Sequence, residues 1–208
     1  YRSSNAAAGT TTFASINNRL GITQFYFGAV ASSGDVVIGG TQDNGTLSWQ
    51  SPSTSWTRIL GGDGGACASD PGNSSTKYVT VQYGDVYKFA PTLQAANAGL
   101  PSHDSSNFAF IAPLVLDPLN SSRLWIGGSH LWRTVNSGGI WVDMVPSPNP
   151  LWNKPKEAVV RGDTVYFAGS TMLVRSTNAT SSSPTWSYYF LGVNPNPLPC
   201  LLGGITLH

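Results

Sequence analysis

Short apolar runs separated by turn-forming residues recur along the chain. Four of these runs are rich in β-branched and aromatic residues, and they cover 36–40, 78–82, 124–128 and 165–169. One central residue marks each run: Val37, Val79, Trp125 and Tyr166. Taken as equivalent positions, these four residues follow one another at intervals of 42, 46 and 41 residues. A repeat of this length is typical of a unit built from four short strands.

Turn signals separate the runs from their neighbours. The segments 70–75 and 117–122 both begin with Asp-Pro and contain Asn-Ser-Ser, a combination that reverses the chain. In the other units the same place holds residues 32–35 and the tripeptide Arg161-Gly162-Asp163. That tripeptide matches an integrin-binding motif, but its position favours a turn. A second strand follows each run, as the alternation in 131–134 indicates.

Helical periodicity is nearly absent, and the one candidate is a short turn at 92–98. The sequence therefore predicts an all-β protein: a β-propeller of four-stranded antiparallel blades, in which no blade buries both faces alone. About four to five blades are expected, forming part of a ring within a single domain of residues 1–208. The predicted blades cover 20–62, 63–110, 111–155 and 156–200, and residues 201–208 are expected to begin a further blade.

Composition narrows the classes of function. Charged residues make up 10% of the chain, against roughly 25% in an ordinary soluble domain. The net charge is +1 without a Lys or Arg cluster, so nucleic acid is not an expected partner. The longest apolar stretch, 108–116, contains Pro113 and is too short to span a membrane. Because no signal-peptide pattern opens the chain, we expect Tyr1 to begin a mature or trimmed chain.

Two cysteines and four sequons bear on the compartment. Cys67 and Cys200 are compatible with a disulfide, possibly to each other, or with two buried thiols. Asn-x-Ser/Thr acceptor sites for glycosylation occur in predicted turns at four positions: Asn44, Asn73, Asn120 and Asn178. These features, together with the turn-rich polar composition, favour a secreted or cell-surface glycoprotein.

One turn motif carries a family resemblance. In 134–141 the pattern Ser/Thr, any residue, Asp/Asn, any residue, Gly, two residues and an aromatic is filled by Thr134, Asn136, Gly138 and Trp141. A variant that is one residue longer contains Asp43, Gly45 and Trp49, and a degraded copy runs from Ser176 to Trp186. The chain thus resembles the Asp-box (BNR) repeat β-propellers, a group that includes sortilin-type ectodomains and secreted xyloglucanase-like glycoside hydrolases.

The resemblance implies a secreted propeller of six to ten blades, so this chain is expected to be a fragment or to close its ring with further chain. It also implies that the motif forms a tight turn between the third and fourth strands, with the aromatic packed beneath it. Because the group contains enzymes, receptors and structural proteins, the resemblance does not fix the function.

Candidate chemistry is sparse. Glycoside hydrolysis needs two carboxylates on either side of the scissile bond, and Asp43 and Asp63 are the candidates because both lie in Gly-rich loops. Their alternative role is turn formation. Glu157 is the only glutamate, the three histidines lack metal-ligand spacing, and no cofactor motif is present. We therefore expect neither a metal nor a cofactor.

Aromatic residues supply the remaining candidates. Trp56, Trp132 and Trp152 are not needed by the turn motifs and could offer flat surfaces to sugar rings. The sequence favours a secreted, non-catalytic propeller module with a binding or structural-assembly role. Its partners are expected to be carbohydrate, an extracellular protein or further copies of the chain. The alternatives are part of a secreted glycoside hydrolase acting on polysaccharide, and a sortilin-like peptide receptor.

Overall fold

Four four-stranded antiparallel sheets make up the structure, a computed structural model that describes residues 2–15, 21–145 and 153–190. Blade 1 contains β1 (Phe25–Val30), β2 (Val36–Thr41), β3 (Gly45–Gln50) and β4 (Thr57–Leu60). Blade 2 contains β5 (Gly64–Asp70), β6 (Asn73–Val81), β7 (Asp85–Phe89) and β8 (Leu93–Ala95), with a 3₁₀ turn, η1 (Gln82–Gly84), between β6 and β7. Blade 3 contains β9 (Leu114–Leu116), β10 (Leu124–Gly127), β11 (Leu131–Thr134) and β12 (Val142–Asp143). Blade 4 contains β13 (Glu157–Arg161), β14 (Thr164–Ala168), β15 (Met172–Ser176) and β16 (Ser187–Phe190).

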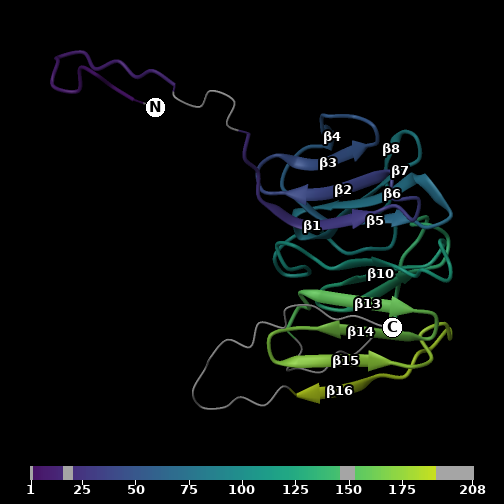
Figure 1. Ribbon diagram of the computed structural model, residues 1–208. Helices are drawn as coiled ribbons and strands as arrows, with labels where there is room; N and C mark the ends of the chain where they lie inside the picture. The colour runs from purple at the N-terminus through teal and green to yellow at the C-terminus, as the bar shows by residue number, and fades with distance from the viewer. Residues whose placement is uncertain (1, 16–20, 146–152, 191–208) are drawn as a thin grey trace.

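The blades follow one another along the chain, from blade 1 in purple and blue to blade 4 in green and yellow (Figure 1). In each sheet the strands lie in chain order, and the first strand of each blade contacts the first strand of the next. This arrangement confirms the predicted all-β fold, with four blades of a partial β-propeller among the described residues. No helix of the described residues is long and apolar enough to cross a membrane.

The hydrophobic core is divided among the three junctions between blades. Ile38 packs with Cys67 and Val79 between blades 1 and 2. A second cluster surrounds Tyr78 and Trp132 between blades 2 and 3. A third joins blades 3 and 4, where Trp125 meets Phe167, Met172 and Val174. Each sheet thus buries side chains on two faces only when it has a neighbour on each side.

The directions in which the side chains point show that the predicted repeat was misaligned at some positions. Tyr78 and Trp125 both point toward the following blade, whereas Val79 packs back against blade 1. Side chains alternate between the faces of a strand, so equivalents must share a direction. On blade 1 the side chain that points toward the following blade is that of Ile38, and its neighbour Val37 points the opposite way. Two of the four predicted equivalences were therefore wrong by one residue, because apolar residues on both faces hide the register.

Residues 92–98 do not form the predicted helical turn. They contain β8, which pairs with β7. Beyond β8, the Ala96 N–H donates to the Val86 carbonyl, and Asn97 Oδ1 accepts the Val86 N–H at 2.6 Å. Pairing along β7 satisfies the backbone and so outweighs the local helical preference of the alanines.

The predicted turn motifs occupy two different places in the blades. The turn at 134–141 joins the third and fourth strands of blade 3, and there Thr134 Oγ1 accepts the N–H groups of Asn136 and Gly138. Asn136 Oδ1 accepts the Ile140 N–H at 2.9 Å, and Trp141 is buried.

The variant at 41–49 is not equivalent to that turn. Its turn joins the second and third strands of blade 1, so Trp49 lies inside β3 and pairs with Val37. The residue immediately before the fourth strand is Trp56 in blade 1, Trp141 in blade 3 and Trp186 in blade 4. Trp56, not Trp49, is therefore the structural counterpart of Trp141.

A buried ion pair organises the entry to β10. The Asp117 side chain is fully buried, and its Oδ2 accepts from Arg123 Nε at 2.8 Å and lies 2.6 Å from Arg123 Nη2. Its Oδ1 accepts the N–H groups of Leu119 and Gly162 at 2.9 and 3.1 Å. Because Gly162 belongs to blade 4, one carboxylate joins two turns of neighbouring blades.

Candidate functional site

Asp43 and Asp63 meet where blades 1 and 2 adjoin. Asp43 lies in the β2–β3 turn with φ of 60°, and Asp63 lies in the connection from β4 to β5. Asp63 Oδ1 accepts the backbone N–H of Asp43 at 2.8 Å, and the Asp63 N–H donates to Gln82 Oε1 at 3.3 Å. The structure therefore brings the two sequence-predicted carboxylates together, and it uses one of them to hold the turn that carries the other.

Glycines make this close approach possible. A Cβ on Gly40 would lie 2.0 Å from the Gly65 carbonyl oxygen, and one on Gly64 would lie 2.4 Å from the Gly45 carbonyl oxygen. These contacts are with backbone, so no side-chain movement could relieve them. Blades 1 and 2 can press together at this end only because the facing positions lack side chains.

A small, open pocket with both polar and apolar lining lies beside the acidic pair. Its volume is about 430 Å³, and it is lined by six residues of two loops: Ile22, Thr23, Gln24, Gln42, Asp43 and Asn44. The loops are joined by the Gln42 N–H, which donates to the Gln24 carbonyl at 2.9 Å. Asn44 Nδ2 donates to Thr23 Oγ1 at 3.2 Å and to the Gln42 carbonyl at 3.0 Å. We name these six residues with Asp63 and Tyr26 the loop site.

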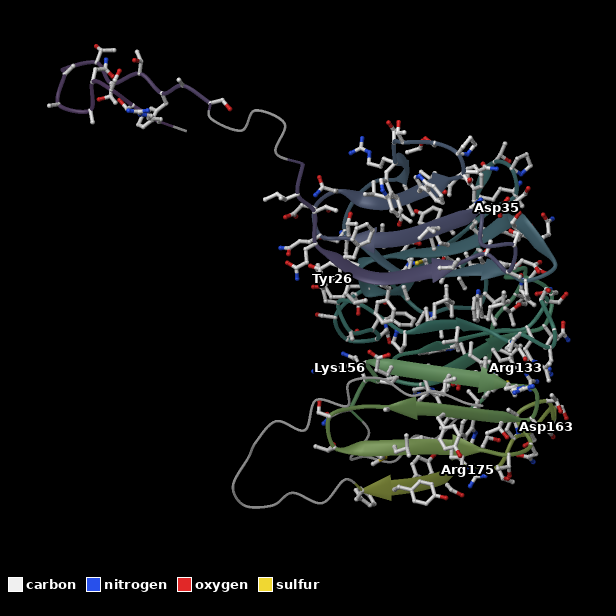
Figure 2. The ribbon with its side chains drawn as sticks, in the orientation of Figure 1. Tyr26, Asp35, Arg133, Lys156, Asp163 and Arg175 are labelled. Carbon is white, nitrogen blue, oxygen red and sulfur yellow. The ribbon has the colours of Figure 1, made fainter. Side chains whose placement is uncertain are left out.

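Tyr26 reports the electrostatics of the loop site. Its pKa is raised above the ordinary value, first by desolvation and then by the negative charges of Asp63 and Asp43. Figure 2 shows Tyr26 at the same end of the strands as Lys156, opposite the end that carries Asp163 and Arg175. The site thus combines carboxylate, amide and hydroxyl groups with a phenol that senses the two carboxylates, a set that can both donate and accept hydrogen bonds.

Of the two predicted tryptophan surfaces that lie among the described residues, one is exposed. Trp56 is 44% exposed, with its ring centroid 5.6 Å from that of Phe25. Trp132 is 5% exposed, because its ring packs between Phe108 and His130, so it offers no surface to a ligand. Trp152 lies outside the described residues.

Cys67 is a buried thiol whose Sγ donates to the Ile38 carbonyl at 3.6 Å. Cys200 lies outside the described residues, so any pairing of the two stays a prediction. Burial raises the pKa of Cys67 from 9.0 to about 12.

The Cys67 thiol is expected to resist alkylation by iodoacetamide at pH 8 in the folded protein and to react once the protein is unfolded, because only the thiolate is nucleophilic. The free energy of unfolding should also fall between pH 9.0 and about 12, where the unfolded thiol ionises and the folded one does not. Below pH 9.0 this contribution is fully present. Comparison with Cys67→Ala, in a Cys200→Ser background, isolates it. Rapid labelling of the folded protein would contradict the burial.

The four sequons fall on or beside turns. Asn44, Asn73 and Asn120 are exposed, and Asn178 is half-buried. Asn44 already uses its Nδ2 within the loop site, and Asn178 Oδ1 accepts the Thr185 N–H at 2.8 Å. Glycosylation therefore stays a prediction, for which Asn73 and Asn120 offer the least engaged side chains.

The sequence did not single out most of the loop site. Asn44 was noted only as a glycosylation sequon, and no binding role was predicted for Thr23, Gln24, Tyr26 or Gln42. The available signal was two short polar segments, 23–24 and 42–44, on either side of one predicted strand pair. Among the described residues no group of three or more His, Cys, Asp or Glu could hold a metal.

A second cavity follows the first strands of all four blades. Its volume is about 580 Å³, and its walls are largely aliphatic, with Val30, Ala68, Val115 and Val159 among them and Arg161 at the rim. Its hydrogen-bonding side chains are few, chiefly those of Ser69 and Arg161. We name it the axial groove.

Comparison with known proteins supports the fold. No protein-family model and no curated protein matches the chain. Among solved structures, a GH74 xyloglucanase from Xanthomonas campestris is 18% identical with a TM-score of 0.58, and the match covers 79% of this chain and 30% of that one. A GH74 enzyme of Niastella koreensis is 16% identical with a TM-score of 0.56, covering 77% of this chain and 23% of that one. The Swd1 β-propeller domain of Myceliophteria thermophila is 9% identical with a TM-score of 0.59, covering 83% and 60%.

These similarities show a β-propeller and nothing finer. The chain spans less than a third of the two GH74 enzymes that it matches. An Asp-box repeat, as distinct from a propeller, stays a prediction.

Proposed function

We propose that this chain is a secreted, non-catalytic β-propeller module that binds carbohydrate through the loop site. The observation that carries the proposal is the pocket in which amide, hydroxyl and carboxylate groups of two adjacent loops converge. Such groups recognise neighbouring sugar hydroxyls by paired donor and acceptor contacts. The low charge of the chain agrees with an uncharged, hydroxyl-rich ligand.

The arrangement of the carboxylates supports binding over hydrolysis. A glycosidase places its acid and its nucleophile or base on either side of the scissile bond. Here Asp63 accepts a hydrogen bond from the backbone of Asp43 and is not among the residues that line the pocket, so the two carboxylates do not face each other across it. Asp63 acts as a scaffold for the turn, which leaves the Asp43 side chain as the group that lines the pocket.

Two features favour hydrolysis as the second candidate. The two carboxylates are neighbours, and the solved structures similar to the chain include a xyloglucanase. In that case a second catalytic side chain would have to face Asp43 across the pocket. For the peptide-receptor alternative, the axial groove is the feature of suitable shape.

Calorimetry with xyloglucan, cello-oligosaccharides and chito-oligosaccharides tests the proposal, with reducing-end assays on the same samples. We expect at least one glycan to bind without release of sugar. Asp43→Asn should weaken that binding about tenfold or more, because charge-assisted hydrogen bonds contribute about 1.5–3 kcal/mol. Asp143→Asn, at another exposed acidic position, serves as the control.

Two results would overturn the proposal. Glycan hydrolysis that is lost in both Asp43→Asn and Asp63→Asn would establish the enzyme instead. Binding that is unchanged in Asp43→Asn would place the carbohydrate elsewhere.

Expression in a eukaryotic secretory host, followed by enzymatic deglycosylation and mass measurement, tests the secreted setting through Asn73 and Asn120.

A further inference from the structure

A second turn adjoins the loop site on the side of blade 2. This turn is η1, which joins β6 to β7 as the turn of Asp43 joins β2 to β3. Both turns lie at the end of the blades that Tyr26 marks in Figure 2. Two hydrogen bonds connect them: Asp63 Oδ1 accepts the Asp43 N–H at 2.8 Å, and the Asp63 N–H donates to Gln82 Oε1 at 3.3 Å. A ligand in the loop site therefore has η1 as a neighbour.

Tyr83, the central residue of η1, has an unusual backbone conformation for its type. Its φ is 60° and its ψ is 31°, in the left-handed region that glycine and asparagine adopt readily and bulky residues rarely do. Its N–H donates to the Phe110 carbonyl at 2.9 Å. The next residue is Gly84, where a Cβ would lie 2.7 Å from the Phe108 ring. A tyrosine makes this turn less stable than an asparagine would, which indicates that its side chain serves another purpose.

The Tyr83 side chain pairs with that of Phe110, and we name these two residues the aromatic corner. The ring centroids are 5.5 Å apart and the ring planes meet at 89°, an edge-on arrangement. Tyr83 is half-buried against the core between blades 2 and 3, whereas Phe110 is 42% exposed. No described residue forms a hydrogen bond with the Tyr83 hydroxyl. The aromatic corner thus offers an exposed ring and a hydroxyl without a partner in the described structure.

We propose that the aromatic corner binds the sugar next to the one in the loop site, so that the ligand is an oligosaccharide extending from blade 1 onto blade 2. This inference rests on the proposed function. A pyranose ring has a face of C–H groups that packs on an aromatic ring, and its hydroxyls can hydrogen-bond a phenol. The corner is continuous with the loop site through Asp63 and Gln82, so one chain of sugars can contact both.

Calorimetry with cello-oligosaccharides and chito-oligosaccharides of increasing length, from the single sugar upward, tests the aromatic corner. The wild-type affinity should rise with length, because only a longer chain reaches from the loop site to the corner. Phe110→Ala should weaken the binding of the longest oligosaccharide about tenfold, the size of one stacking contact, and have less effect on shorter ones. Tyr189→Ala, at a position on blade 4 that is 45% exposed, is the control and should bind as the wild type does.

Tyr83→Asn separates the side chain from the turn. Asparagine adopts the left-handed conformation readily, so this variant should unfold at no lower temperature than the wild type. It should nevertheless lose affinity for the longest oligosaccharide as Phe110→Ala does, because the ring and the hydroxyl are gone. Tyr83→Phe keeps the ring and should recover most of that affinity. A stable Tyr83→Asn variant with weakened binding therefore reports the loss of a sugar contact and not of the fold.

Asp43→Asn distinguishes failure of the aromatic corner from failure of the proposed function. It should weaken the binding of every length by a similar factor, since all lengths occupy the loop site. If Asp43→Asn weakens binding and the substitutions at Tyr83 and Phe110 do not, the corner is overturned and the loop site stands. The corner is also overturned if affinity does not depend on length, or if its variants weaken all lengths equally. If no oligosaccharide binds, both proposals are wrong.

Discussion

Replacement of Asp117 by alanine should lower the free energy of unfolding by about 3–5 kcal/mol, the cost of breaking a buried ion pair. The Asp117 carboxylate is fully buried and accepts from the guanidinium of Arg123 and from the backbone of Leu119 and Gly162. Its loss leaves a largely buried guanidinium and two N–H groups without their acceptor. Urea denaturation followed by tryptophan fluorescence measures the change.

Blade 2 offers a matched control for this variant. Asp70 begins the equivalent Asp-Pro turn, but it is only half-buried and its Oδ1 accepts the Gly72 N–H at 2.8 Å. Asp70→Ala should therefore cost about 1 kcal/mol, the usual contribution of one hydrogen bond. Equal losses in the two variants would mean that the ion pair adds nothing beyond the turn.

Gly40→Ala should lower the free energy of unfolding by about 3 kcal/mol, at the upper end of the usual cost of overpacking. The added methyl would lie 2.0 Å from the Gly65 carbonyl oxygen and 2.6 Å from Gly64 backbone atoms. Blade 1 must then move away from blade 2, which separates Asp43 from Asp63. Thermal unfolding and carbohydrate binding should both be impaired.

Gly28→Ala controls for the loss of a glycine from a blade 1 strand. At Gly28 a Cβ would lie 3.7 Å from the Ile38 carbonyl oxygen, an ordinary contact. This variant should be close to wild type in stability and in binding. If Gly40→Ala were equally mild, the close approach of the two blades would not require a glycine.

The repeat was predictable because the sequence features that produce it, turns and strand-forming runs, act locally. Asp-Pro turns, β-branched runs and their spacing indicate four-stranded units whatever surrounds them. The direction of each run was not predictable, since both faces of a blade are buried and Val37 and Ile38 look alike in the sequence. Only the packing of Ile38 against Cys67 distinguishes them.

Tryptophans show the same limit. Trp49 follows a Thr-x-Asp-x-Gly pattern and was assigned to the turn motif, whereas the structural counterpart is Trp56, preceded by a turn with little resemblance to the motif. Trp132 gave no sign of burial, because the Phe108 ring that packs against it comes from a segment that the sequence does not connect to β11.

The loop site was half-predictable for a related reason. Gly-rich flanks indicated that Asp43 and Asp63 lie in loops, and the structure brings them together. The glycines of 61–65 do not all form a loop, however. Gly64 and Gly65 are buried in β5, where the backbone of blade 1 makes its closest approach to blade 2. Nothing local says that Tyr26 and Gln42 approach the same point, because that depends on how β1 pairs with β2.

The anchoring of Gly162 bears on cell adhesion. The Arg161-Gly162-Asp163 tripeptide is held in its turn at two points, because the Gly162 N–H donates to Asp117 and the Asp163 carboxylate accepts the Thr180 N–H at 3.1 Å. A receptor that binds the Asp163 carboxylate would have to compete with the second of these contacts. We accordingly expect that cells plated on the folded protein do not attach through this tripeptide. Attachment through it would indicate that the turn in blade 4 had unfolded.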